Sequence, residues 1–329
     1  MAVGLAVLEL CAGGGGQALG LEAAGFACAA AIELDTASCA TLRQNRPHWQ
    51  VIQADIRNLN GLDFRGIDLL AGGVPCPPFS IAGQQLGRDD DRDLFPQALR
   101  IIEESHPAAV MLENVPGFAS AKFRTYRHRL AASLMRMGYV PRWTILNACD
   151  FGVPQLRPRF LLTALHQRAA SRFVWPEGLG QQPPSVGDAI ADLMASRLWP
   201  GAPAWTRAAS GIAPTIVGGS RKHGGPDLGP TRARRQWATL GVDGLGIADE
   251  PPGPGFPADG HPRLTLAMVA RLQGFPDSWH FAGKKTAAYR QIGNAFPPPV
   301  AAQVASAIAE ALTATPNSSA RRSQPSLFA

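Results

Sequence analysis

The chain has 329 residues, a length that suits one large domain and a smaller one. Of these residues 46% are hydrophobic and 17% are charged, as in a globular protein with a sizeable core. No apolar run is long enough to span a membrane, the five scattered cysteines do not form a disulfide framework, and the seven histidines form no metal-binding cluster. We therefore expect a soluble, cytoplasmic protein without a metal, and the net charge of +6 favours a polyanionic partner.

Short apolar strands alternate with helices through the first half of the chain. The first strand is predicted at residues 3–10, where Glu9 argues against a signal peptide. Further strands are predicted at 26–32, 51–54, 67–71 and 108–112, and helices at 18–24 and 36–45. This alternation predicts an α/β fold with a parallel sheet, helices on both faces, and a ligand at the carboxyl ends of the strands.

The character of the sequence changes at about residue 173. Residues 173–262 are rich in Pro, Gly, Trp and Arg, and their only clear periodicity is a short helix near 186–193. Helical patterns return at 266–272 and 300–312. We therefore predict a discontinuous first domain at 1–172 and 286–315, a loop-rich second domain at 173–285, and a disordered tail at 316–329.

Basic residues are concentrated in one stretch of the chain. Residues 120–172 contain ten lysines and arginines against one acidic residue, whereas residues 1–72 contain four against seven. A one-sided basic block of this kind is typical of a surface that follows phosphates, and a solvated helix face is the alternative.

A glycine-rich loop, residues 11–16, follows the first predicted strand and opens a helix. Its glycines allow a ligand to approach the backbone, and the helix start offers free N–H groups. Glu33 ends the second strand, where a carboxylate suits ribose hydroxyls, and Asp55 follows the third strand within reach of an adenine. These residues favour an adenosine-containing cofactor; a tight structural turn with surface acids is the alternative.

Three reactive or charged groups follow the later strands. Cys76 lies between two prolines on the loop after the fourth strand, at the ligand-binding edge of the sheet, where a nucleophile would be placed. Glu113 ends the next strand at the same edge, and a carboxyl beside a thiol predicts nucleophilic addition assisted by proton donation. Arg157 and Arg159 would point the same way on an extended segment and could hold a phosphate or a base edge.

Taken in order, these segments resemble the motifs of the DNA (cytosine-5)-methyltransferases over about residues 3–172 and 263–312. The matching segments are the glycine loop, Glu33, Asp55, Pro75-Cys76, residues 92–95, Glu113-Asn114-Val115, Gln155-x-Arg157-x-Arg159, residues 263–265 with 271–276, and residues 291–295 with Pro297. The chain departs from the family in having Cys11 for phenylalanine, Glu9 for aspartate and Pro77 for glutamine. The loss of phenylalanine puts an aromatic contact with the cofactor adenine in doubt.

The resemblance implies a Rossmann-like S-adenosylmethionine-dependent methyltransferase sheet with helices on both faces, joined to a smaller, loop-rich target recognition domain. It implies S-adenosylmethionine as methyl donor, S-adenosylhomocysteine as product, and double-stranded DNA as the partner of a monomeric enzyme associated with the bacterial nucleoid. Whether a cognate restriction endonuclease acts on the same DNA site stays open.

The resemblance also implies a covalent mechanism on a cytosine flipped out of the duplex. Cys76 would attack C6 as a thiolate, Glu113 would bond N3 and the exocyclic amine, and Arg159 would bond O2 and favour the thiolate. Arg157 would support the site or a phosphate. Cofactor contacts are expected from Cys11, Ala12, Gly13, Gly15, Glu33, Leu34, Asp55, Ile56, Pro75, Leu94, Asn294 and Ala295.

The variable segment at about 173–262 is the part that reads the DNA sequence in this family. Its basic, glycine-rich stretch suits close approach to a groove, because arginine is the commonest reader of guanine. We expect DNA contacts from Ser80, Arg221, Lys222, Arg232, Arg234 and Arg235. A solubilising loop is the alternative.

Three other functions are alternatives to this one. A related enzyme acting on transfer RNA keeps the catalytic motifs but lacks a sizeable recognition segment, whereas this chain has roughly 90 residues of one. A catalytically dead DNA-binding relative would have lost the nucleophile, the acid or a cofactor glycine. An NAD-dependent oxidoreductase is suggested only by the glycine loop and has no use for Cys76.

Overall fold

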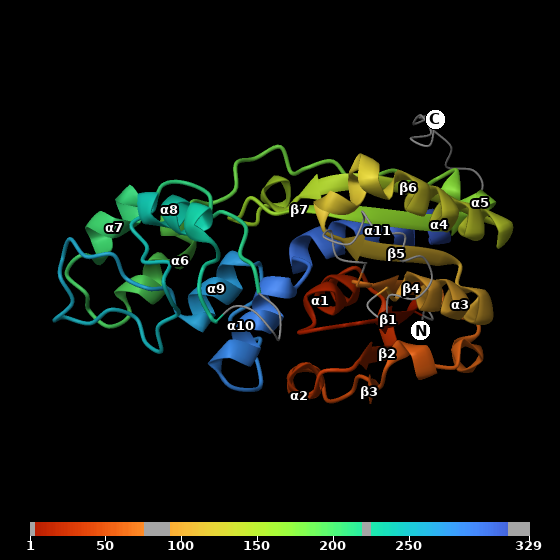
Figure 1. Cartoon of the computed structure of the whole chain (residues 1–329), viewed down its shortest axis with the longest axis horizontal. Coiled ribbons are helices and arrows are strands. Elements are labelled where there is room, and N and C mark those ends of the chain that lie inside the picture. Colours follow the sequence, from red (N-terminus) through yellow and green to blue (C-terminus); the bar gives the residue numbers. More distant parts are fainter. Residues whose placement is uncertain (1–3, 76–92, 219–224, 315–329) are drawn as a thin grey trace.

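The computed structural model describes residues 4–75, 93–218 and 225–314 (Figure 1). Within these residues the chain forms a seven-stranded sheet in the order β3-β2-β1-β4-β5-β7-β6. The strands are β1 (Ala6–Leu10), β2 (Ala27–Glu33), β3 (Val51–Gln53), β4 (Leu69–Gly72), β5 (Ala109–Asn114), β6 (Tyr139–Asn147) and β7 (Pro158–His166). The first five are parallel, so their carboxyl ends meet at one edge, as expected for a ligand-binding α/β sheet.

The sheet is mixed, because two strands beyond the five predicted ones join it at one side through antiparallel pairing. β7 runs antiparallel to β5, and β6 runs antiparallel to β7. Neither strand was predicted, because Pro141 and Arg142 interrupt the apolar pattern of β6 and the start of β7 was assigned only to an extended charged segment. The α/β class and the five parallel strands are confirmed.

Helices cover both faces of the sheet, as predicted. One face packs on α1 (Gly16–Ala23) and α11 (Pro298–Thr313), and the other on α3 (Phe95–Ser105) and α4 (Arg124–Arg136). The α1–α11 contact needs a glycine, since a Cβ at Gly20 would lie 2.4 Å from the Cβ of Ala301. α11 therefore packs directly on α1, the helix that follows the glycine loop.

The second half of the chain builds a separate lobe, at the left of Figure 1. It contains α6 (Val186–Ala195), α7 (Ala202–Ala208) and α8 (Thr231–Thr239), and α9 (Leu266–Leu272) and α10 (Lys285–Asn294) lie between it and the sheet. Their apolar side chains form one continuous core that extends to Leu42 and Trp49 of the sheet-bearing lobe. The two remaining α-helices, α2 (Thr36–Asn45) and α5 (Gln167–Ala170), flank the sheet strands.

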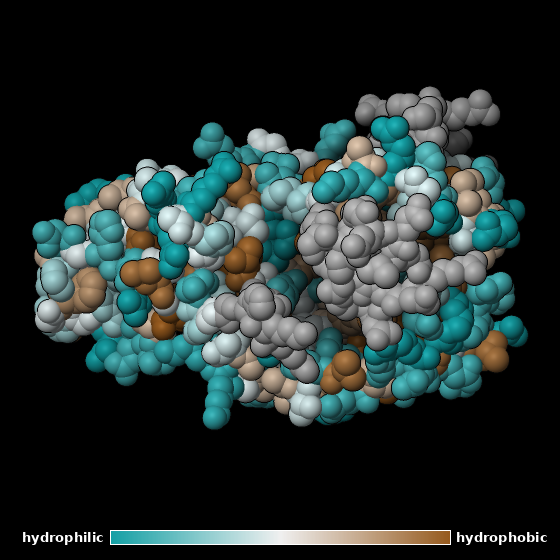
Figure 2. All heavy atoms as spheres, viewed as in Figure 1, coloured by the Kyte–Doolittle hydropathy of each residue, from teal (hydrophilic) through white to brown (hydrophobic). Residues whose placement is uncertain are grey.

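Among the described residues, no helix combines the length and the apolar character that crossing a bilayer requires. On the face of the molecule that Figure 2 shows, the described residues are mainly hydrophilic, with scattered apolar side chains.

Candidate active site

A cavity of about 760 Å³ opens at the carboxyl ends of the parallel strands. Its size is in the range of small-molecule and cofactor sites. The wall contains eleven of the twelve residues expected to hold the cofactor: Cys11, Ala12, Gly13, Glu33, Leu34, Asp55, Ile56, Pro75, Leu94, Asn294 and Ala295. Gly15 is the exception, because it faces away from the cavity, where a Cβ would lie 2.6 Å from the Trp279 ring.

The glycine loop lines the cavity, and residues of α10 and of the turn after it approach the loop backbone so closely that two loop positions have no room for a side chain. A Cβ at Gly16 would lie 2.4 Å from the carbonyl oxygen of Phe296, and a Cβ at Gly14 would lie 2.9 Å from the Cβ of Gln291. At Gly13 the reason differs: its φ of +55° belongs to the left-handed region, and no atom of the described residues lies within 4 Å of its Cβ position. A side chain there would enter the open space of the cavity.

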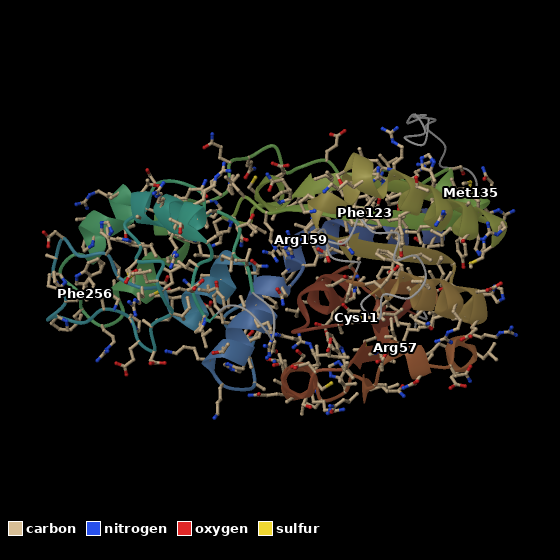
Figure 3. The ribbon with its side chains drawn as sticks, viewed as in Figure 1. Cys11, Arg57, Phe123, Met135, Arg159 and Phe256 are labelled. Atoms are coloured by element: carbon tan, nitrogen blue, oxygen red, sulfur yellow. The ribbon has the colours of Figure 1, made fainter. Side chains whose placement is uncertain are left out.

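Two carboxylates lie at the ends of β2 and β3. Glu33 accepts hydrogen bonds from the backbone N–H groups of Gly13 (2.7 Å), Leu34 (2.8 Å) and Asp35 (2.7 Å), which fix its position beside the loop. Asp55 is held by Arg57, whose guanidinium approaches to 2.6 Å and keeps the pKa of the Asp55 carboxyl below its usual value. Figure 3 labels Cys11 and Arg57 on this side of the sheet.

Sequence analysis missed two buried polar residues of the cavity. Glu9 on β1 is 2% exposed, and its burial, followed by repulsion from Glu33, raises its pKa to about 8. Gln17 on α1 is 4% exposed, and its Nε2 has no hydrogen-bond partner among the described residues. The sequence marks both positions, since an acid stands inside an apolar strand and an amide stands at the start of an apolar helix.

A buried ion pair joins Glu113, which lines the cavity, to Arg159, which is not among the lining residues. Arg159 Nε on β7 is 2.8 Å from Glu113 Oε1 on β5, and both side chains are about nine-tenths buried. Burial raises the pKa of Glu113, and the positive charge of Arg159 opposes that rise. The structure therefore brings these two predicted site residues together, and Glu113 lines the cavity.

Asn114 connects this pair to the strand that leads to Cys76. Its Nδ2 donates to the carbonyl oxygen of Val74 at 2.8 Å, so the ends of β4 and β5 are held together. Pro75 and Gly73 line the cavity on the same side, and a Cβ at Gly73 would lie 3.3 Å from Glu113 Oε2. The last described residue before Cys76 therefore lies in the wall that also contains the carboxyl.

Arg157 lies beside this site and not in it. Its side chain is wholly buried, and its guanidinium donates to the carbonyl oxygens of Ile216 (2.5 Å), Gly293 (2.7 Å) and Ala295 (2.9 Å). A group so enclosed reaches neither a phosphate nor a base, so the expectation of phosphate binding is wrong and the supporting role remains. The two arginines have different partners, since Arg157 donates to backbone carbonyl oxygens from the second half of the chain and Arg159 pairs with Glu113.

Half of the predicted basic block has a structural role. Five of its ten basic side chains donate to backbone carbonyl oxygens: Arg127, Arg142, Arg157, Arg159 and Arg172. Arg127 also lies over the Trp143 ring at 5.3 Å from its centroid. The phosphate-following surface therefore stays a prediction only for the exposed remainder, such as Arg124 and Arg129 on α4.

Four predicted residues lie outside the described part of the chain: Cys76, Ser80, Arg221 and Lys222. The three other expected DNA contacts, Arg232, Arg234 and Arg235, lie on α8 in the second lobe and do not line the cavity. Arg232 and Arg235 are exposed. Their contact with DNA stays a prediction.

Comparison with known proteins identifies the family of this chain. The model of the family described as C-5 cytosine-specific DNA methylase matches residues 5–310. The chain is 55% identical to the Type II methyltransferase M.NaeI of Lentzea aerocolonigenes over 94% of this chain and 75% of that protein. It is 50% identical to M.NgoMIV of Neisseria gonorrhoeae, over 93% and 97%.

Solved structures agree on the fold. Spodoptera frugiperda DNMT2 matches with a TM-score of 0.67 at 18% identity, covering 93% of this chain and all of that one. A putative DNA modification methyltransferase from an E. coli prophage matches with the same TM-score at 22% identity, over 94% of this chain and all of that one. With the family model matching nearly the whole chain, this protein belongs to the C-5 cytosine-specific DNA methylases.

Proposed function

We propose that this DNA (cytosine-5)-methyltransferase takes its methyl group from S-adenosylmethionine, modifies one DNA sequence, and attacks cytosine through Cys76. The observation that carries the proposal is the cavity itself. Its lining contains the glycine loop and Glu33 as well as Glu113, which pairs with the buried Arg159. A cofactor and a base could therefore meet in one cavity.

The residues of the cavity fit S-adenosylmethionine. The Cβ position of Gly13 is open, as a ligand lying on the loop requires, and the buried donor of Gln17 has no partner within the described chain. Glu33 would accept from the ribose hydroxyls, Asp55 and Ile56 would flank the adenine, and Asn294 and Ala295 would close the site from the end of the chain. When bound, this cofactor supplies an electrophilic methyl group.

Cys76 would supply the electrons that make cytosine reactive. Its thiolate adds to C6, which ends the aromaticity of the ring and gives C5 the character of an enamine. After C5 is methylated, loss of the C5 proton and departure of the thiolate restore the ring. Arg159, which pairs with Glu113, would favour the thiolate.

Glu113 would hold the base and balance the charge of the addition. Burial raises its pKa, which favours the proton-bearing form that would donate to N3 as the thiolate adds. Arg159, 2.8 Å from the same carboxyl, would bond the base O2. Because C6 is covered in a duplex, the base must first be flipped out, at a cost of a few kcal/mol.

The second lobe would supply the contacts that offset this cost and choose the sequence. We propose residues 173–285 as the recognition domain and 1–172 with 286–315 as the catalytic domain, acting as a monomer. Trp279 of the proposed recognition domain contacts the proposed catalytic domain, since its Nε1 donates to the Gly14 carbonyl oxygen at 3.0 Å. Following the Type II designation of its relatives, we place the enzyme in a restriction–modification system with a cognate endonuclease.

The test is methyl transfer from labelled S-adenosylmethionine by the purified protein. We expect label in the 5-methylcytosine of double-stranded DNA and none in transfer RNA, because the chain has a recognition segment of roughly 90 residues. Label in transfer RNA alone would show that the RNA-modifying alternative is right. Tight DNA binding without any label would support the catalytically dead alternative.

A further inference from the structure

Two backbone segments from different lobes touch beside the cofactor cavity. Gly218, the last described residue of the segment 213–218, lies against Gly293 at the end of α10. A Cβ at Gly293 would lie 2.4 Å from the Gly218 nitrogen, and a Cβ at Gly218 would lie 2.6 Å from the carbonyl oxygen of Arg290. Neither glycine has a positive φ, so close approach is what requires them.

A buried polar clamp, made of the side chains of Gln155, Arg157 and Gln273, holds the same two segments together. Arg157 donates to the carbonyl oxygens of Ile216 on one side and Gly293 on the other. The Gln155 side chain accepts from the Ile216 N–H at 3.0 Å and donates to Gln273 at 2.6 Å. All three side chains are wholly buried, so these bonds are protected from water.

The clamp reaches the cofactor cavity through the residues that follow α10. Gln273 Nε2 donates to the carbonyl oxygen of Ala295 at 2.8 Å, and Arg157 donates to the same oxygen at 2.9 Å. Ala295 and Asn294 line the cavity. A Cβ at Gly218 would also lie 2.5 Å from Asn294 Oδ1. The segment 213–218 is therefore the support behind this wall of the cavity.

We propose that Gly218 is a positioning residue for the cofactor, so that cofactor affinity depends on how the segment 213–218 lies on α10. This inference rests on the proposed use of S-adenosylmethionine. Binding linkage is reciprocal: if the segment holds the cavity wall in place, a bound cofactor stabilises the segment. The segment leads toward the basic stretch expected to contact DNA, so the same contact would let cofactor and DNA favour each other.

A matched pair of alanine variants tests the inference. Gly218→Ala must move the segment away from the Arg290 carbonyl, whereas at Gly225, seven residues further along, no described atom lies within 4 Å of the Cβ position. With S-adenosylhomocysteine in calorimetry, we expect Gly218→Ala to bind about tenfold more weakly or worse and Gly225→Ala to match the wild type. The melting temperatures of both variants show whether they are folded.

Hydrogen exchange of the wild-type protein tests the reciprocal effect without any variant. S-adenosylhomocysteine should slow amide exchange in residues 213–218, and exchange in α8 of the same lobe should stay unchanged. Equal affinity of Gly218→Ala and wild type, or unchanged exchange in 213–218 on saturation, would overturn the inference while leaving the proposed cofactor intact. Failure of the wild type to bind S-adenosylhomocysteine would instead overturn the proposed cofactor, and the inference with it.

Discussion

Replacing Cys76 with serine is expected to lower methylation of DNA by at least about a thousandfold, because a serine hydroxyl is a far weaker nucleophile than a thiolate. Binding of S-adenosylhomocysteine and of DNA should remain close to wild type, since the cavity residues and the second lobe are unchanged. Single-turnover methyl transfer together with calorimetry measures both effects.

Cys149→Ser is the matched control. Cys149 is buried away from the cavity, and burial raises the pKa of its thiol, so it is a poor nucleophile. That variant should turn over like the wild type. Substantial methylation by Cys76→Ser would contradict the covalent mechanism, because burial raises the pKa of every thiol among the described residues, including that of Cys11 in the cavity wall.

Replacing Glu113 with glutamine should lower kcat by about a hundredfold or more, since the carboxyl that would donate to N3 is lost. It also leaves the buried Arg159 without its ion-pair partner, which costs about 3 kcal/mol in the free energy of unfolding. Burial raises the pKa of Glu113, so the protonated form is lost only as the pH rises above the usual carboxyl range. The wild-type rate should therefore fall on the alkaline side as Glu113 ionises, and the variant should lack that limb.

The control for Glu113→Gln is Glu104→Gln. Glu104 also pairs with an arginine, Arg100 at 2.8 Å, but away from the cavity and with about a quarter of its side chain exposed, and it also accepts from the Gly61 N–H at 2.7 Å. Since solvent screens a partly exposed pair, and glutamine keeps an acceptor for Gly61, this change should alter stability by about 1 kcal/mol or less and leave turnover unchanged. Wild-type turnover and pH profile in Glu113→Gln would show that the carboxyl has no part in the reaction.

The cofactor half of the site could be predicted from the sequence because its signals are local. A glycine loop after a strand, an acid at the end of the next strand and a further acid after the third each sit within a few residues of their strand. Once the strands are parallel, their carboxyl ends meet. The structure accordingly places Cys11, Glu33 and Asp55 in one cavity.

The features that were missed depend on contacts between distant parts of the chain. β6 and β7 are stabilised by pairing with each other and with β5, which apolar periodicity alone does not reveal. Arg157 looked like a ligand-binding group, yet its partners come from residues 216, 293 and 295. Gly15 belongs to the same loop as the cavity glycines but packs on Trp279, more than 250 positions away in the chain.

The most direct test of the account is to express the chain in a host that lacks cytosine methylation and to map 5-methylcytosine in the genome by bisulfite sequencing. Expression of Cys76→Ser in the same host provides the control. The account predicts methylation of one cytosine within a single short recognition sequence in cells with the wild-type protein, and none with the variant. A genome free of 5-methylcytosine despite abundant folded protein, or equal methylation by both proteins, would contradict it.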